Sequence, residues 1–428
     1  MKKICWLVLF SQFLFFGCSC SQKSYQFYFQ LLEDGSYRLT AISGTLPEHL
    51  AIPEEYNHQP VTAIGSQVMY HCENAEQLKS VEIPDSVRTI EWKAFEFCVA
   101  LESVTLGSGI NDIDDSAFAA TNLNEIHLSA DNPNYTVADH CLINNEREIV
   151  LGTNQSEIPP DIKGIKPSAF SNRRNLRKAA IPGGCLTIGA GAFRDCISLC
   201  EVELSEGVQV IESKAFYGTP IQEVTVPGTV KEIGDIFYNC WTLEKVTLSE
   251  GCAIIGDDAF SLCPALEKLV LPSTIQQIKS AKCFDSVQTP DVIALSPENK
   301  FYEMREDCLF ERETSRLVLA FDANIPEATK IIGEHSFWRV SIGEELIIPG
   351  EVTMIEESAF HCTDTTKTIF LPDSVQRIAQ GAFYVVEGTT FLCEAAACPE
   401  NWHKDFLFPY DGTPVSYIAV VWGYLPIY

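Results

Sequence analysis

The sequence predicts a mainly β solenoid of about twelve stacked coils, and three observations support this prediction. A pattern recurs about every 23 residues, each repeat carries the same apolar positions, and two longer segments interrupt the series at equivalent places. One repeat cannot bury its own apolar face, so it must stack on its neighbours. The repeats are marked by Ala94-Phe95, Ala117-Phe118, Ala169-Phe170, Ala192-Phe193, Ala215-Phe216, Ala259-Phe260, Ala359-Phe360 and Ala382-Phe383.

The apolar positions within one repeat predict its local structure. Val104 and Leu106 stand two apart, which is typical of a short strand with one buried face. The spacing from Ile90 to Phe95 predicts a tight helical or 3₁₀ turn on the other side of the coil. Strands of successive coils then lie parallel on one face. The inward positions of this repeat are Ile90, Ala94, Phe95, Cys98, Leu101, Val104 and Leu106.

A second period of 167 residues indicates an internal duplication. Asn132, Tyr135, Cys141 and Phe170 recur as Asn299, Tyr302, Cys308 and Phe337. Each half contains one insertion, near residues 130–160 and 296–328, because two of the Phe-to-Phe intervals are 52 and 53 residues long. Apolar alternation in both insertions predicts β-hairpins, which turn near Asn144-Asn145 and near Glu313-Thr314.

The first residues predict export. Lys2-Lys3 precede an apolar run that ends at Gly17-Cys18, and this run is too short for a good membrane span. Residues 1–17 are therefore interpreted as a signal peptide. The Gly-Cys ending resembles the lipobox of bacterial lipoproteins, which implies acylation of Cys18; Cys20 is a second candidate, and plain secretion is the alternative.

The remaining boundaries follow from where the repeats begin and end. We expect a tether at 18–30, an N-terminal cap at 31–63 and the repeat solenoid at 64–393. The segment 394–428 is rich in aromatic residues and is expected to cap the last coil.

Composition excludes several kinds of site. The net charge of −28 argues against a generic binder of nucleic acid or anionic membranes. Cys98, Cys196, Cys240 and Cys263 share one repeat position, so they are expected to form a buried column of inert thiols. The sequence contains no CxxC pair that would suggest a zinc site, and the acidic run 112–115 lacks a calcium-loop pattern. No cofactor or metal is expected.

Catalysis is not indicated. The chain has no GxSxG, HExxH or phosphate-binding glycine motif, and its eight histidines are scattered. Glu203 and Glu223 could form a carboxylate pair of the kind glycosidases use, but acidic residues are common on solvated strand faces. We therefore expect a non-enzymatic protein.

The repeat unit resembles the BspA-like, or Treponema-type, leucine-rich repeats of bacterial surface proteins. The resemblance rests on Ile-xxx-Ala-Phe-xx-Cys-xx-Leu-xx-Val-x-Leu-Pro, on the turn Pro84-Asp85-Ser86-Val87 and on Asn132-Pro133-Asn134-Tyr135 in the first insertion. It covers nearly all of the mature chain. It implies a recognition scaffold, with adhesion to host matrix proteins or to other bacteria as the activity of some members. The turn of each insertion departs from the family, because Asp139-His140 and Glu306-Asp307 stand where Asp-Gly is common.

Two surfaces are candidate ligand sites, because stacked coils present outward residues as stripes and projecting loops often carry function. The strand face has an acidic concentration and, farther along, an apolar row whose alternative is burial under the C-terminal segment. The insertions carry side chains that are expected to be exposed, unless the hairpins merely pack on the stack. The candidates are Glu201, Glu203 and Glu223, then Val270, Ala294, Ile347 and Phe370, and in the insertions Tyr135, His140, Tyr302 and Arg305.

These observations predict a non-enzymatic recognition protein of the cell envelope. A protein ligand on a host matrix or bacterial surface is the leading hypothesis, and the expected location is the outer membrane or cell surface. A periplasm-facing or secreted protein is the alternative location. A glycan-binding lipoprotein, suggested by Tyr135, Tyr302 and Trp402, and a structural envelope scaffold are the alternative functions.

Overall fold

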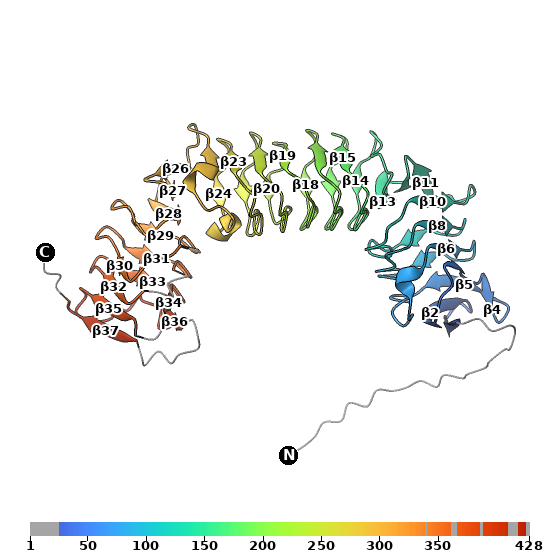
Figure 1. Cartoon of the computed structure of the whole chain (residues 1–428), viewed down its shortest axis with the longest axis horizontal. Coiled ribbons are helices and arrows are strands. Elements are labelled where there is room, and N and C mark those ends of the chain that lie inside the picture. The colour runs from blue at the N-terminus through green and yellow to red at the C-terminus, as the bar shows by residue number, and fades with distance from the viewer. Residues whose placement is uncertain (1–24, 339, 361–365, 386–387, 410–417, 425–428) are drawn as a thin grey trace, which may run out of the picture.

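The computed structural model is an arch of parallel-strand turns, which confirms the predicted β solenoid (Figure 1). It has about 15 turns where the sequence predicted about twelve coils. It describes residues 25–338, 340–360, 366–385, 388–409 and 418–424. A typical coil has three sides: a strand of three or four residues, a strand of two residues, and a turn that contains the Ala-Phe pair. We call these sides the long-strand face, the short-strand face and the Phe edge.

The long-strand face consists of parallel ladders whose apolar residues alternate inward and outward. Val104 and Leu106 are fully buried, whereas Thr105 between them is exposed. Its strands are β3 (His49–Ala51), β6 (Ser80–Ile83), β8 (Ser103–Leu106), β10 (Glu125–Leu128), β15 (Lys178–Ile181), β17 (Glu201–Leu204), β19 (Glu223–Val226), β21 (Lys245–Leu248), β23 (Lys268–Leu271), β25 (Ile293–Leu295), β30 (Glu345–Ile347), β32 (Thr368–Leu371), β35 (Thr390–Cys393) and β37 (Ala419–Trp422).

The short-strand face carries two-residue parallel strands that the sequence analysis did not predict, and the Ile-to-Phe segment expected to be a helical or 3₁₀ turn follows each of them. Each strand ends in the repeat's buried Ile. The described 3₁₀ segments are η1 (Ala75–Gln77), η2 (Ala281–Phe284) and η3 (Pro290–Val292). The two-residue strands are β7 (Thr89–Ile90), β9 (Asp112–Ile113), β14 (Gly164–Ile165), β16 (Thr187–Ile188), β18 (Val210–Ile211), β20 (Glu232–Ile233), β22 (Ile254–Ile255), β24 (Gln277–Ile278), β29 (Ile331–Ile332), β31 (Met354–Ile355) and β33 (Arg377–Ile378), and they follow the longer β5 (Gln59–Ile64).

Backbone conformation explains why most Ala-Phe turns are not helical. The residue before the Ala is left-handed in several coils, with φ of 54° at Lys93, 57° at Lys214 and 58° at Asp258. A right-handed helix cannot pass through such a residue. The turn therefore bends sharply and leaves the Phe ring pointing into the core.

The Phe rings of the described chain stack from coil to coil beneath the Phe edge in three runs, which extend from Phe95 to Phe118, from Phe170 to Phe237 and from Phe337 to Phe383. The ring centroids of Phe170 and Phe193 lie 4.9 Å apart and those of Phe193 and Phe216 lie 5.3 Å apart, with nearly parallel planes. All three side chains are fully buried. The predicted inward position of the Phe is therefore confirmed, and the rings tie each coil to the next.

The cysteine column is also confirmed. The thiols of Cys196, Cys240 and Cys263 donate to the carbonyl oxygens of Phe170, Phe216 and Phe237 in the preceding coil, at 3.0, 3.1 and 3.2 Å. All cysteines among the described residues are free thiols. A buried thiol thus satisfies a backbone acceptor that the turn leaves open.

Each insertion is a three-stranded meander, so the predicted hairpins are present but incomplete. β12 (Cys141–Asn144) and β13 (Glu148–Gly152) form the predicted first hairpin, and β27 (Cys308–Glu311) and β28 (Arg316–Leu319) form the second. β11 (Tyr135–Ala138) and β26 (Tyr302–Arg305) add an antiparallel strand to each. The added strands turn through Asp139-His140 and Glu306-Asp307, where both residues have positive φ. Consecutive left-handed residues are typical of a type I′ hairpin turn.

The arch bends at the two insertions (Figure 1). Its core accordingly divides into three clusters, which span residues 39–151, 141–319 and 308–418. In the last segment, β30, β32, β35 and β37 lie on the outer side of the arch (Figure 1). The inner side is formed by β34 (Phe383–Val385) and its parallel partner β36 (Leu407–Pro409) of the Phe edge.

Both ends of the chain differ from the predicted boundaries. β1 (Tyr25–Leu31) pairs with β2 (Tyr37–Gly44), and β4 (Glu55–Tyr56) pairs with β5, so residues 25–30 are not a tether. Alternating aromatic residues explain this strand, since Phe29 stacks on Tyr56 at 4.4 Å. At the other end, parallel pairing continues to β37, so the solenoid extends past residue 393. The buried Trp402 and Phe406 replace the usual repeat residues there, which hides the coil from pattern analysis.

Arg173 fills the first bend. It stands three residues after Phe170, the position that cysteines occupy in other coils, and it is fully buried. Its guanidinium donates to the carbonyl oxygens of Gly152 and Thr121, both at 2.6 Å, and of Ser171 at 2.9 Å. Burial lowers its pKa to about 10, so it is still charged at neutral pH. The side chain therefore joins the coils before and after the insertion.

Replacing Arg173 with alanine should lower the free energy of unfolding by about 3 kcal/mol, because several buried carbonyl groups would lose their donor. Urea unfolding followed by circular dichroism measures the loss. Arg174→Ala is the matched control, because the neighbouring Arg174 is exposed. Equal midpoints for the two variants would show that Arg173 does not hold the bend.

Candidate ligand-binding surfaces

The acidic part of the long-strand face is solvent-exposed and paired with lysines. The side chains of Glu201, Glu203 and Glu223 are 66%, 65% and 63% exposed. Lys178 Nζ lies 2.6 Å from Glu203 and 3.9 Å from Glu201, and Lys245 Nζ lies 2.8 Å from Glu223. Exposed ion pairs contribute little stability. The structure thus brings these carboxylates onto one surface, but with a cation beside each.

A groove opens within this acidic region because the strand ladder is interrupted. β17 pairs with β15, and β19 pairs with β21, but β17 and β19 belong to different sheets. The interval from Phe216 to Phe237 is 21 residues instead of about 23, which shortens this coil. The resulting groove of about 320 Å³ is lined by Val202, Glu203, Leu204, Glu223, Val224, Thr225, Lys245 and Thr247.

The predicted apolar row exists but is divided by the second insertion. Val270 and Ala294 are register partners in β23 and β25, and both are half-buried. Ile347 and Phe370 are partners in β30 and β32, on a separate sheet. The prediction of a single continuous row is therefore wrong.

The second part of the row is longer than predicted. Phe370 is in register with Leu392, and Leu392 with Val421. The exposed fraction is 65% for Ile347 and 43% for Val421. Phe370 is half-buried, and its ring lies 5.9 Å from that of Tyr424. The described part of the C-terminal segment thus contacts one member of the row and leaves Ile347 open.

The tyrosines of the insertions are not exposed, contrary to prediction. The exposed fraction is 8% for Tyr135 and 4% for Tyr302. The hydroxyl of Tyr302 accepts a hydrogen bond from Ile278 N at 2.9 Å. Burial raises the pKa of Tyr135 to about 12 and raises that of Tyr302 as well. These phenols fasten each meander to the short-strand face, which removes them as ligand contacts.

The other two insertion residues lie in different halves of the protein. His140 is exposed in the turn between β11 and β12. Arg305 is half-buried, with its guanidinium 4.7 Å from the ring centre of Phe310 and paired with Glu303. Each sits in its own meander, so they form no common site.

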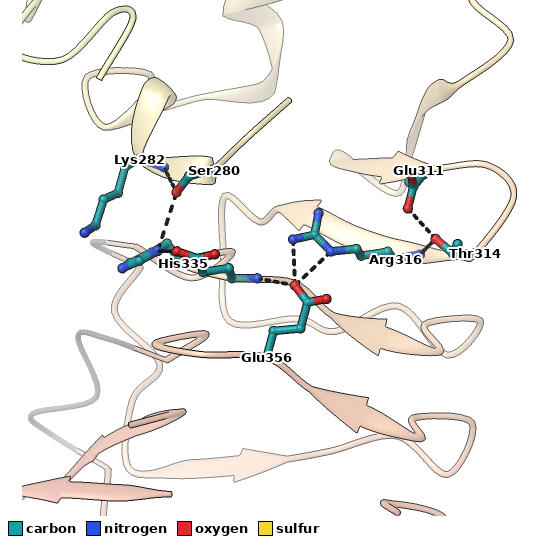
Figure 2. A network of polar contacts seen from close by, with 8 residues as sticks. Ser280, Lys282, Glu311, Thr314, Arg316, His335 and Glu356 are labelled. Carbon is teal, nitrogen blue, oxygen red and sulfur yellow. Dashed lines mark hydrogen bonds and ion pairs between the residues drawn. The ribbon is translucent and has the colours of Figure 1, made fainter. Parts of the chain in front are cut away.

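A Ser–His–Glu grouping at the second bend lacks the geometry of a catalytic triad (Figure 2). Ser280 Oγ lies 3.5 Å from His335 Nδ1, and Glu334 Oε1 lies 3.1 Å from the same nitrogen. A triad needs the serine and the carboxylate on opposite ring nitrogens. Ser280 instead caps η2 by accepting from Lys282 N. Nearby, Arg316 and Glu334 N both donate to Glu356, which holds β28 to later coils.

The acidic run 112–115 lines a cleft of about 430 Å³ beside the first meander. Asp114 accepts hydrogen bonds from the backbone and hydroxyl of Ser116, and burial raises the pKa of Asp115. Among the described residues, no group of three or more His, Cys, Asp or Glu side chains could hold a metal ion. Within this same part of the chain, no helix is long and apolar enough to cross a bilayer.

The sequence did not reveal three aromatic residues of the Phe edge, of which Trp241 is exposed and Tyr217 and Tyr238 are half-buried. Tyr217 and Tyr238 each directly follow a repeat Phe, and their rings stack at 6.0 Å. Trp241, four residues after Phe237, is 62% exposed. An aromatic residue directly after the buried Phe in two successive repeats is the signal that the sequence carries for this surface.

The repeats themselves decide the relationship to known proteins. The model of the BspA type leucine rich repeat region matches six copies, over residues 49–161, 163–291 and 320–393. The chain belongs to the BspA-type leucine-rich repeat family. The matched ranges contain the first meander, and they stop before the second meander and resume after it. No curated protein matches this BspA-type chain.

Solved structures of similar repeat proteins come from several bacteria. A leucine-rich cell surface protein of Faecalibacterium prausnitzii is 21% identical, with 92% of this chain and 86% of that chain covered and a TM-score of 0.31. The leucine-rich repeat protein of T. pallidum is 22% identical, with 56% and 87% covered and a TM-score of 0.28. A leucine-rich repeat protein of Bacteroides ovatus is 19% identical, with 90% and 100% covered and a TM-score of 0.35.

Proposed function

We propose that this BspA-type protein is exported, is held at the cell envelope through an acylated Cys18, and binds a protein ligand without catalysing a reaction. Membership of the family supports a surface or interaction role in general. Cys18 lies outside the described residues, so its role rests on the sequence of the first 18 residues. The ligand surface that we propose is the row Ile347, Phe370, Leu392 and Val421.

The observation that carries this proposal is the exposure of Ile347. An isoleucine that is 65% exposed, in register with a half-buried Phe and Leu, makes an apolar stripe on a parallel sheet. Contiguous exposed apolar surface is typical of protein interaction sites. A glycan ligand has weaker support, because Tyr135, Tyr302 and Trp402, the aromatics expected to bind sugar, are all buried.

Replacing Ile347 with aspartate should change the free energy of unfolding by less than about 0.5 kcal/mol, because the side chain faces solvent. Leu346→Ala on the same strand should cost about 3 kcal/mol, because Leu346 is 2% exposed. Urea midpoints of the two variants measure the difference. A large loss in Ile347→Asp would mean that the chain itself covers the row.

Site-specific photo-cross-linking on intact cells tests ligand binding. A benzoylphenylalanine at position 347 should give one adduct of defined mass, and Val421→Asp should abolish it. The matched position is Glu82, which is exposed on the same face of a distant coil. Adducts of equal yield from both positions, or none from position 347, would contradict binding through the row.

A further inference from the structure

We propose that the Phe edge of the central coils carries a second recognition surface, which binds an acidic segment of a partner protein through Arg194, Tyr217, Tyr238 and Trp241. This surface lies in a different core segment from the row at Ile347. Its test can therefore fail without affecting the proposed function, and the reverse also holds.

The side chains of this surface form a ladder across three successive coils. The guanidinium of Arg194 lies 4.5 Å from the ring centre of Tyr217, whose ring stacks on Tyr238 at 6.0 Å and 11°. Backbone hydrogen bonds join the same turns, since Asp195 N donates to Tyr217 O at 2.8 Å. The ladder is therefore held by the solenoid itself and does not need a ligand to form.

The guanidinium of Arg194 is only partly engaged by other side chains of the protein. Nε of Arg194 is 3.3 Å from Asp195, and the side chain is 48% exposed. Its Nη groups donate no hydrogen bond to another described residue. Two parallel N–H groups that a stacked ring holds in place can bind a carboxylate in bidentate geometry. The ordering cost of this arginine is already met in the unbound protein.

The turns beside Arg194 carry two further cations. Lys214 Nζ lies 5.6 Å from the ring centre of Tyr238. The turn that contains Arg174 lies beside that of Arg194, because Asn172 N donates a hydrogen bond to Arg194 O at 2.7 Å. Arg174 is exposed, and no ion pair in the described chain includes it. Two carboxylates accompany these three cations, since Arg194 pairs with Asp195 and Lys214 Nζ lies 4.0 Å from Asp235, so this set of side chains keeps one cation in excess. Charge complementarity therefore favours an acidic partner.

The exposed Trp241 favours an acidic partner that also has apolar side chains. Trp241 is 62% exposed, and its Nε1 donates to Asn239 at 2.6 Å, which fixes the ring. Tyrosine, tryptophan and arginine together are the residues that dominate binding energy at protein interfaces. A protein segment that combines carboxylates with apolar side chains uses both the cations and the rings.

The test is fluorescence polarisation of the mature chain with a labelled ten-residue peptide in which glutamates alternate with leucines. The glutamine version of the peptide is the charge control. We expect the glutamate peptide to bind at least tenfold more tightly, and Arg194→Gln or Trp241→Ser to weaken it at least tenfold. Both side chains are largely exposed, so both variants should fold. Lys93→Gln is the matched variant, because Lys93 also lies over an aromatic ring, that of Trp92, but has no stacked ladder.

Three results would overturn the proposal. The first is equal binding of the two peptides, and the second is equal loss in Lys93→Gln and Arg194→Gln. The third is Arg194-dependent binding of a heparin-type oligosaccharide without binding of the glutamate peptide, which would assign the edge to an anionic glycan instead.

Discussion

Replacing Phe193 with alanine is expected to lower the free energy of unfolding by about 4 kcal/mol. The ring is fully buried and stacks on Phe170 at 4.9 Å and on Phe216 at 5.3 Å. Its removal leaves a cavity shared by three coils, and the rigid backbone turns cannot close around it. Because each coil is stabilised by its neighbours, the loss should spread to both sides. Urea unfolding by circular dichroism and hydrogen exchange of the adjacent coils measure the effect.

The control for this variant is Ile197→Ala, since Ile197 is in the same turn and 59% exposed. It should unfold within about 0.5 kcal/mol of the parent protein. If Phe193→Ala were as stable as Ile197→Ala, the stacked rings would not be what couples the coils.

Alkaline pH is expected to destabilise the fold by several kcal/mol as the thiols of the unfolded chain ionise. Burial raises the pKa of the thiols of Cys98, Cys141, Cys196 and Cys393 to about 12, and of Cys185, Cys240, Cys252 and Cys308 to about 11. The unfolded chain ionises its thiols near pH 9, so between pH 9 and 11 the folded state holds more protons. The stability is full below pH 9 and falls as the pH rises. Each such thiol contributes about 1 kcal/mol to the loss at pH 10.

Urea midpoints at pH 8 and pH 10 under reducing conditions measure this loss. In a separate experiment, a thiol reagent at pH 8 measures how far the fold protects the buried cysteines from modification. Cys200 and Cys398 are exposed and should react in the folded protein, which calibrates the assay. A Cys196→Ala, Cys240→Ala variant should lose less stability between the two pH values. A midpoint that does not change between pH 8 and pH 10 would contradict a buried column of neutral thiols.

The sequence predicts the core of this protein well because a repeat position has the same environment in every coil. The predicted inward positions from Ile90 to Leu106 are all buried, as their spacing indicates, whereas Trp92 and Phe97 between them are exposed. What the spacing does not contain is backbone handedness. The left-handed residue before the Ala is Lys, Ser, Asp or Gly in different coils, so no single residue type marks the turn, and the predicted helical or 3₁₀ turn is absent from most coils.

The candidate site was harder to predict because exposure depends on neighbours outside the repeat. Tyr135 and Tyr302 look like loop residues, yet each packs on the short-strand face of an earlier coil. β17 and β19 belong to different sheets, and strand alternation gives no sign of this. Arg173 stands at a cysteine position, so its role at the bend appears only when the insertion is placed in space.

The central claim is that this BspA-type protein acts outside the cytoplasm, and protease treatment of intact cells tests it most directly. The mature N-terminus is identified by mass analysis in the same experiment. We predict cleavage of the protein on intact cells and an acylated Cys18 as its first residue. A protein that is protected until the cells are lysed, and that keeps residues 1–17, would contradict the claim.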